Sequence, residues 1–424
     1  MHVSGSLIRN IDEGRLIEFL KKKNIKHSEE EMGLDTNIWV GKLIDENRID
    51  VEDLNEHFFS DLFYGQRRLM RIYKLRSVRM INKNSDWING ICSQFDINSL
   101  DFNNIVGTGV GTDAKEQVKI AAIKTTFSST SKIENIRILF AKHMVVRENG
   151  NDTYTCSYLP VEFNLNEKIV IIKVRNRQYY NENYSSDDLM DSIIKLLFDT
   201  MNIEISNFEH NPQEVLYRMT KGLLDEFFNT IPNINQIETL TEPIACFVNN
   251  IINSGIYTNI EQTEINGKNY SILNKDILDL NEEIAQLLQQ AAAFDYFRNF
   301  PIDSITDSIT AILVSIRFND IDNASARLTG EKRTRAIFNS KTFMSIRKSI
   351  DLVASVVALS IAYNKKRGRI IVKYDTSDNG FLKIHILNNR YYDESDFNNI
   401  WEMYKSYESE LVEDTGELRI SSII

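Results

Sequence analysis

Two aspartates in this sequence have the spacing of a magnesium site. Asp320 and Asp322 follow an apolar stretch, 311–316, that predicts a buried strand. Two carboxylates one residue apart at a strand end can share a Mg²⁺ ion, as metal-dependent nucleases require. Asp, Asn and Ser after a strand are also typical of an ordinary turn. A Mg²⁺-dependent nuclease with Asp320 and Asp322 as metal ligands is therefore one alternative for the function.

The positive charge of this acidic chain is concentrated in two stretches. The first basic window (67–83) contains seven Lys and Arg and no acid, and the second basic window (317–373) contains thirteen against four acids. The whole chain carries a net charge of −11, so the rest of it carries −27. Like charges repel one another, and a fold tolerates such crowding more readily where an anionic partner meets it.

Phosphate binding needs cations on one face, and the second basic window can supply them from a predicted loop, a helix start and a strand entry. Such contacts to DNA or RNA would be independent of base sequence and sensitive to salt. The candidate residues are Arg333, Arg335, Lys341, Arg347, Lys348, Lys366, Arg367 and Arg369, joined by Arg67, Arg68 and Arg71 of the first basic window. The competing interpretation is that acidic stretches of the same chain or of a partner subunit neutralise these cations.

The first basic window has cations on both faces of a predicted strand, 71–79. Two interpretations fit this pattern. The segment is either an edge strand, where charges discourage aggregation, or a basic rim beside a groove.

No motif in the sequence specifies a reaction. The six histidines and three cysteines do not have the spacing of metal ligands or of a catalytic pair, and we expect no cofactor other than Mg²⁺ under the nuclease alternative. Spatially assembled sites leave no such trace, so the sequence favours a non-enzymatic protein without excluding an enzyme.

The composition indicates the compartment in which we expect the protein. Three widely separated cysteines suit a reducing compartment, and residues 1–9 lack the pattern of a signal peptide. No apolar run approaches the roughly 18 to 20 residues that span a bilayer, so we expect a cytoplasmic protein without a membrane. The abundance of Asn, Ile and Lys is typical of an AT-rich genome, which suggests a bacterial or mobile-element source and an antiviral defence role.

Changes of periodicity along the chain predict an α+β protein with four parts. We expect a helical N-terminal module at 1–64, an antiparallel β meander at 65–180, an all-helical middle at 181–300 and a C-terminal α+β domain with the basic face at 301–424. The helical module is either a helix-turn-helix or a simple packing module. Asn149-Gly150 predicts a hairpin turn in the meander.

Two long helices are predicted in the second half of the chain. A heptad pattern of apolar residues from Ile277 to Phe294 predicts either a core helix or a homodimer seam. A second helix is expected from Ser340 to Tyr363, between strands at 309–318 and 369–374.

Three hypotheses of function follow. The leading one is a non-enzymatic nucleic-acid-binding subunit of a bacterial or mobile-element complex. The second is the Mg²⁺-dependent nuclease. The third is an interaction subunit whose acidic surface docks a basic partner protein.

Overall fold

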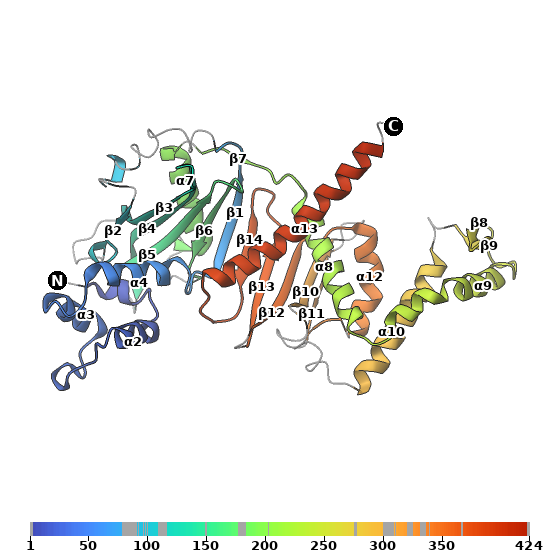
Figure 1. Cartoon of the computed structure of the whole chain (residues 1–424), viewed down its shortest axis with the longest axis horizontal. Helices are drawn as coiled ribbons and strands as arrows, with labels where there is room; N and C mark the ends of the chain where they lie inside the picture. Colours follow the sequence, from blue (N-terminus) through green and yellow to red (C-terminus); the bar gives the residue numbers. More distant parts are fainter. Residues whose placement is uncertain are drawn as a thin grey trace. The chain divides into compact units, whose positions relative to one another are not determined.

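The computed structural model divides into two compact units (Figure 1). Unit 1 comprises Met1–Pro212 with Val372–Ile424, and unit 2 comprises Gln213–Ile371. The predicted fold class, helices combined with an antiparallel sheet, is confirmed. The structure describes residues 3–78, 91, 93–95, 97, 99, 101–108, 117–148, 151–176, 184–201, 203–274, 278–299, 309, 311–319, 325–330, 336–338, 340–365 and 368–421.

The two units do not follow the order of the chain, because the last part of the sequence returns to unit 1. The chain enters unit 2 at the start of α8 (Pro212–Asn229) and leaves it within β13 (Gly368–Asp375). The four predicted parts are successive stretches of sequence, and whether each of them folds by itself stays a prediction. No helix in the described ranges is both long and apolar enough to span a membrane.

Unit 1 begins with helices, as predicted. α2 (Glu13–Lys22) and α4 (Val51–Phe63) each follow an aspartate, Asp12 or Asp50, whose side chain accepts a hydrogen bond from a backbone N–H of the first turn. The other helical segments of this module are α1 (Gly5–Ile8), η1 (Glu29–Glu31) and α3 (Thr36–Asp45).

The centre of unit 1 is an antiparallel sheet that contains the predicted β meander. Its strands follow the order β13-β14-β1-β6-β5-β4-β3-β2, and β7 pairs with the end of β1. Glu148 pairs with Asn151, and the predicted turn residues between them lie outside the described ranges. The bounds are β1 (Leu69–Leu75), β2 (Phe102–Asn103), η2 (Val106–Thr108), β3 (Gln117–Phe127), β4 (Ile133–Glu148), β5 (Asn151–Asn164), β6 (Ile169–Val174), β7 (Ile205–Ser206) and β14 (Leu382–Ile386).

The two faces of this sheet carry different side chains, because successive strand residues point to opposite faces. Phe163 belongs to an apolar core that includes side chains of α7 (Ser186–Met201). Its neighbour Glu162 points the other way and pairs with Lys173. Aromatic rings from α4 and from α13 (Glu394–Ser421) surround the Lys173 ammonium group. Figure 1 shows α7 on one side of these strands and α13 on the other.

The position of β1 corrects one prediction. β1 pairs with β14 on one side and with β6 on the other, so it lies inside the sheet. The expected edge strand in the first basic window is therefore wrong. A strand with two neighbours has no open backbone edge for charges to protect.

Unit 2 combines a group of three antiparallel strands with helices and a hairpin. β10 pairs with both β11 and β12, and the strand predicted at 309–318 is found as β10 (Ala311–Asn319). The remaining bounds are η4 (Ile234–Leu240), α9 (Thr241–Ile252), β8 (Ile260–Ile265), β9 (Lys268–Leu273), α10 (Leu280–Asn299), β11 (Ser325–Thr329), α12 (Lys341–Val353) and β12 (Ala358–Lys365).

The helix predicted from Ser340 to Tyr363 is wrong in its second half. α12 stops before Ala354, which has a left-handed φ of 47°, and the chain continues as the strand β12. A short apolar run such as 356–363 fits a buried strand as well as a buried helix.

A hairpin lies in the middle of the chain, where only helices were expected. β8 pairs with β9, and Asn266 and Gly267 join them with φ angles of 51° and 74°. Positive φ at both central residues is the requirement of a tight hairpin turn, and Asn-Gly meets it with little strain. The middle of the chain is thus mainly, but not wholly, helical.

Candidate functional site

Two arginines of the first basic window lie inside unit 1. The Arg67 side chain is fully buried, and its Nη1 donates to the backbone oxygen of Asn10 at 2.8 Å. Arg71 is also buried and pairs with Asp187 at 2.7 Å and with Asp191. Both guanidinium groups are therefore used by contacts within the fold.

The other described cations of this window also have partners in unit 1. Arg68 donates to the backbone oxygen of Asn388 at 2.9 Å. Lys74 lies 3.7 Å from the Glu408 carboxylate, and an exposed pair joins Arg76 to Glu204. Charge density in the first basic window thus reflects pairing between distant parts of the chain, and we leave Arg67, Arg68 and Arg71 out of any proposed binding surface.

The second basic window is described only in part. Arg333, Arg335, Lys366 and Arg367 lie outside the described ranges, and for Lys341 and Lys348 the structure describes the backbone of α12 alone. Arg347 Nη1 lies 3.4 Å from Gln289 Oε1, and Arg369 Nε donates to Asn364 Oδ1 at 2.8 Å. The structure therefore describes the side chains of only Arg347 and Arg369 from this set, and the phosphate contacts stay a prediction.

The predicted metal ligands Asp320 and Asp322 also lie outside the described ranges. Within those ranges, no group of three His, Cys, Asp or Glu side chains is placed to hold a metal ion. The nuclease alternative stays a prediction.

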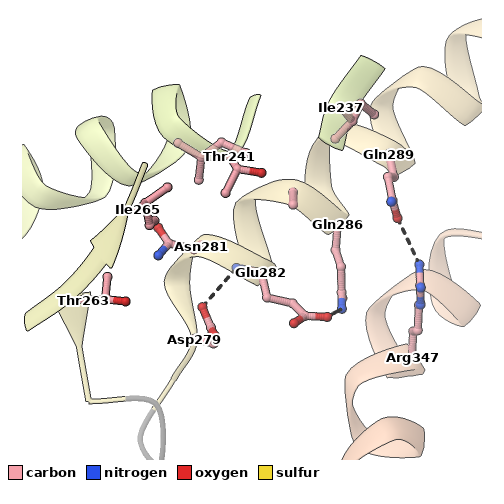
Figure 2. A pocket seen from close by; sticks show the side chains of 12 residues that line it. Ile237, Thr241, Thr263, Ile265, Asp279, Asn281, Glu282, Gln286, Gln289 and Arg347 are labelled. Atoms are coloured by element: carbon pink, nitrogen blue, oxygen red, sulfur yellow. Dashed lines mark hydrogen bonds between the residues drawn. The ribbon is translucent and has the colours of Figure 1, made fainter. Parts of the chain in front are cut away.

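A cavity of about 470 Å³ lies in unit 2 and is lined by described residues (Figure 2). This volume is within the usual range of ligand pockets. Side chains of η4, α9, β8, α10 and α12 surround it. The lining residues are Ile237, Thr241, Ile244, Thr263, Ile265, Asp279, Asn281, Glu282, Ala285, Gln286, Gln289 and Arg347.

Hydrogen bonds at the start of α10 fix the polar side of this cavity. Asp279 Oδ1 accepts the backbone N–H of Glu282 at 3.1 Å, which caps the helix. One turn later, Gln286 Nε2 donates to Glu282 Oε1 at 3.1 Å. Figure 2 shows Arg347 beside Gln289 and away from Asn281 and Ile265.

Except for Arg347, the residues that line the cavity belong to a strongly acidic part of the sequence. The acidic segment (234–299) contains nine Asp and Glu against three Lys and Arg, a net charge of −6. Lys268 is paired with Glu242, and this hydrogen bond holds the pKa of the Glu242 carboxyl below its usual value. The excess of acids in this segment is a charge pattern that attracts cations.

The acidic segment also exposes many large apolar side chains. Phe247 on α9 and Leu287 on α10 are 56% and 62% exposed. The full set in this segment is Leu240, Phe247, Ile256, Ile260, Leu287 and Leu288. Single exposed apolar residues are normal, whereas a large contiguous patch of them is typical of an interaction surface.

α8 and α10, two long helices of unit 2, differ in how many side chains they bury. α8 has 18 residues and buries eight side chains. α10 has 20 residues, and Ala293 is its only buried side chain among those described. Leu280 and Ile284, the first half of the predicted heptad seam, pack partly on α9, whereas Leu287 does not. The apolar face of α10 is thus packed near the start of the helix and exposed at Leu287.

The sequence matches no known protein-family model, and no curated protein is significantly similar to it. The heptad of α10 and the acids at its start were visible in the sequence. The cavity was not, because it needs the hairpin β8–β9 to be placed beside α10.

Proposed function

We propose that this protein is an interaction subunit that binds a basic partner protein through the acidic segment of unit 2. The observation that carries this proposal is the exposure of α10, a helix of 20 residues that leaves Leu287 and Leu288 open. Helices of soluble proteins gain most of their stability from burying an apolar face, so an open one of this length suggests a partner.

The charge of the segment indicates the kind of partner. A net charge of −6 repels nucleic acid and attracts Lys and Arg. Apolar side chains together with acids suit an amphipathic helix that presents leucines and lysines, since such helices dock in apolar grooves. Complementary charge speeds the encounter and excludes acidic competitors.

A pair of peptides tests the proposal. The first is an amphipathic helix of about 20 residues with Leu on one face and Lys on the other, and the second has Glu in place of every Lys. We expect the Lys peptide to bind roughly tenfold or more tightly than the Glu peptide, as measured by fluorescence anisotropy in physiological salt.

Variants that do not change the charge locate the binding. The double change Leu287→Ser with Leu288→Ser should weaken the Lys peptide about fivefold or more, because it removes apolar contact area. The control is Phe127→Ser, a change at a similarly exposed side chain of unit 1. Equal affinity of the double variant, the control and the unchanged protein would show that the peptide binds only through general charge attraction.

Nucleic-acid binding is the second candidate, favoured by the net charge of +9 in the second basic window. On this hypothesis Arg333, Arg335, Lys341, Arg347, Lys348, Lys366, Arg367 and Arg369 contact phosphates, in a subunit of a bacterial or antiviral complex. A gel-shift series with duplex and single-stranded DNA and RNA at rising salt tests it. Absence of any shift at about 50 mM salt would remove this candidate.

A further inference from the structure

We infer that the cavity in unit 2 binds an alkylammonium group, the side chain of a lysine on the partner. This inference rests on the proposed function and names the group that the same site recognises. The cavity combines an apolar wall with a group of hydrogen-bond acceptors, and a lysine side chain has the same two parts, an alkyl stem and a cationic tip.

The apolar wall comes from three elements. Ile237 of η4, Ile244 of α9 and Ile265 of β8 line the cavity with their hydrocarbon side chains. Ala285 of α10 leaves room between them, since it has no atoms beyond Cβ. About 470 Å³ is more space than one alkyl chain fills, so a neighbouring side chain of the partner fits as well.

The acceptors lie on the first turn of α10. Asp279, Asn281 and Glu282 all line the cavity. Asn281 Oδ1 is buried and has no hydrogen-bond partner among the described residues. A buried acceptor without a donor is unfavourable, and a ligand N–H would satisfy it. Asn281 and Ile265 both line the cavity, so this acceptor and the apolar wall face the same space (Figure 2).

An anionic ligand fits this site less well. Arg347 is the one cationic side chain of the lining, and Gln289 Oε1 and Asp351 Oδ2 lie 3.4 and 3.9 Å from its guanidinium group. Asp279 and Glu282 also line the cavity, so its described lining carries two carboxylates and one guanidinium group. An ammonium group brings three donors and one positive charge, which match the Asn281 carbonyl oxygen and the two carboxylates of the same lining.

Two small probes of equal chain length test the inference. Hexylammonium chloride carries the proposed group, and hexan-1-ol is its neutral counterpart. Titration of the full-length protein, followed by the NMR methyl signals of its isoleucines, should show saturable shifts at Ile265 and Ile237. We expect hexylammonium to bind about fivefold or more tightly than hexanol, the effect of one charge-assisted hydrogen bond.

Variants separate the cavity from general charge attraction. Glu282→Gln should weaken hexylammonium about three- to tenfold and leave hexanol unchanged, and Asn281→Leu should weaken hexylammonium by a similar factor. Glu226→Gln, which removes the same charge from an exposed position on α8, is the matched control and should change neither. Equal binding of the two probes, or equal effects of Glu282→Gln and Glu226→Gln, would overturn the inference.

The outcome is distinguishable from failure of the proposed function. If the Lys peptide binds through Leu287 and Leu288 while hexylammonium does not bind, the proposed function is supported and the inferred lysine site is wrong. If hexylammonium binds at the cavity and the peptide does not bind, the inferred alkylammonium site is supported and the proposed helical partner is wrong.

Discussion

Strand β1 and the acidic segment both concentrate charge, yet their side chains meet very different surroundings. In β1, Arg71 is buried against Asp187, a residue 116 positions away in the sequence. The acidic segment has a net charge of −6 with Lys268 paired to Glu242, and several of its large apolar side chains are exposed. A dense run of charge in a sequence therefore does not by itself indicate a binding surface. What matters is whether the folded chain supplies the opposite charge.

The difference also shows in how each region is held. Arg71 and Lys173 of unit 1 are buried on a sheet covered by helices, so removing a partner leaves a charge in a medium of low polarity. Charges in the acidic segment lie at a surface, where water replaces a lost partner at little cost. The predictions below test this contrast in order of expected effect.

The largest effect is expected at Lys173, whose side chain is 0% exposed. Its ammonium group lies 3.3 Å from Glu162 and within 4.7 Å of the ring centres of Phe63, Tyr64 and Phe397. Lys173→Met leaves the Glu162 carboxylate without this partner, so the free energy of unfolding should fall by about 3 to 5 kcal/mol.

Urea unfolding followed by tryptophan fluorescence measures this change, because all three tryptophans (Trp39, Trp87 and Trp401) belong to unit 1. Lys22→Met is the control, since Lys22 makes an exposed pair with Glu18 on the same unit. The control should change stability by less than about 0.5 kcal/mol. A similar small change for Lys173→Met would contradict a buried charge network.

The second prediction compares one leucine on each helix of unit 2. Leu223 on α8 is 1% exposed and Leu287 on α10 is 62% exposed. Leu223→Ala should destabilise the protein by about 2 to 5 kcal/mol through the cavity it leaves. Leu287→Ala should change stability by less than about 0.5 kcal/mol. Hydrogen exchange of the α8 and α10 amides measures both.

A large cost at Leu287 would mean that α10 packs on another part of this same chain, and the proposed partner would lose its main support. A small cost at Leu223 would contradict the packing of α8. The pair of variants therefore tests the comparison from both sides.

Some of this fold could be predicted from the sequence, and the reason is local. The meander has strands of alternating pattern joined by short turns, so neighbours in sequence are neighbours in space. Strand β12 was missed because an apolar run of eight residues has no distinguishing period. The hairpin at Asn266-Gly267 has the same dipeptide signal as the predicted turn at 149–150, although only helices were expected in this part of the chain.

The candidate site was harder to predict, because it depends on pairing at a distance. Nothing near Arg71 in the sequence indicates that Asp187 and Asp191 neutralise it. Leu287 in the second half of the heptad pattern is exposed. A heptad pattern predicts an apolar face on a helix, but it does not indicate which part of that face packs against the rest of the chain. The acids at the start of α10 were visible, but the apolar wall beside them was not.

The third prediction concerns pH and Glu162. Burial by itself would raise the pKa of this carboxyl, but the charges of Lys173 and Arg137 outweigh burial and lower the pKa to about 2. The unfolded chain then binds more protons than the folded one between about pH 2 and 4.5. The stabilisation is fully present above pH 4.5 and is lost as the pH falls towards 2, by up to about 3 kcal/mol.

An NMR titration of the Glu162 carboxyl carbon measures this pKa directly. Urea unfolding from pH 5 down to pH 2.5 should also show a steeper loss of stability for the unchanged protein than for Glu162→Gln. A Glu162 midpoint at or above the ordinary value near 4.5 would mean that Lys173 and Arg137 do not stabilise the carboxylate.

The smallest expected effect is at the turn that places β8 beside α10. Gly267 and Gly380 both have open space where a Cβ would be added, but only Gly267 has a positive φ, 74°. Gly267→Ala should therefore cost about 1 kcal/mol, while Gly380→Ala should be near neutral. Because Thr263 and Ile265 of β8 line the cavity, Gly267→Ala should also weaken hexylammonium binding, whereas Gly380→Ala should not. If hydrogen exchange of the hairpin amides is unchanged in Gly267→Ala, the hairpin does not depend on this turn. The position of β8 in the cavity wall would then depend on another contact, such as the packing of β9 on α9. Leu273 of β9 and Val248 of α9 belong to the same small apolar core.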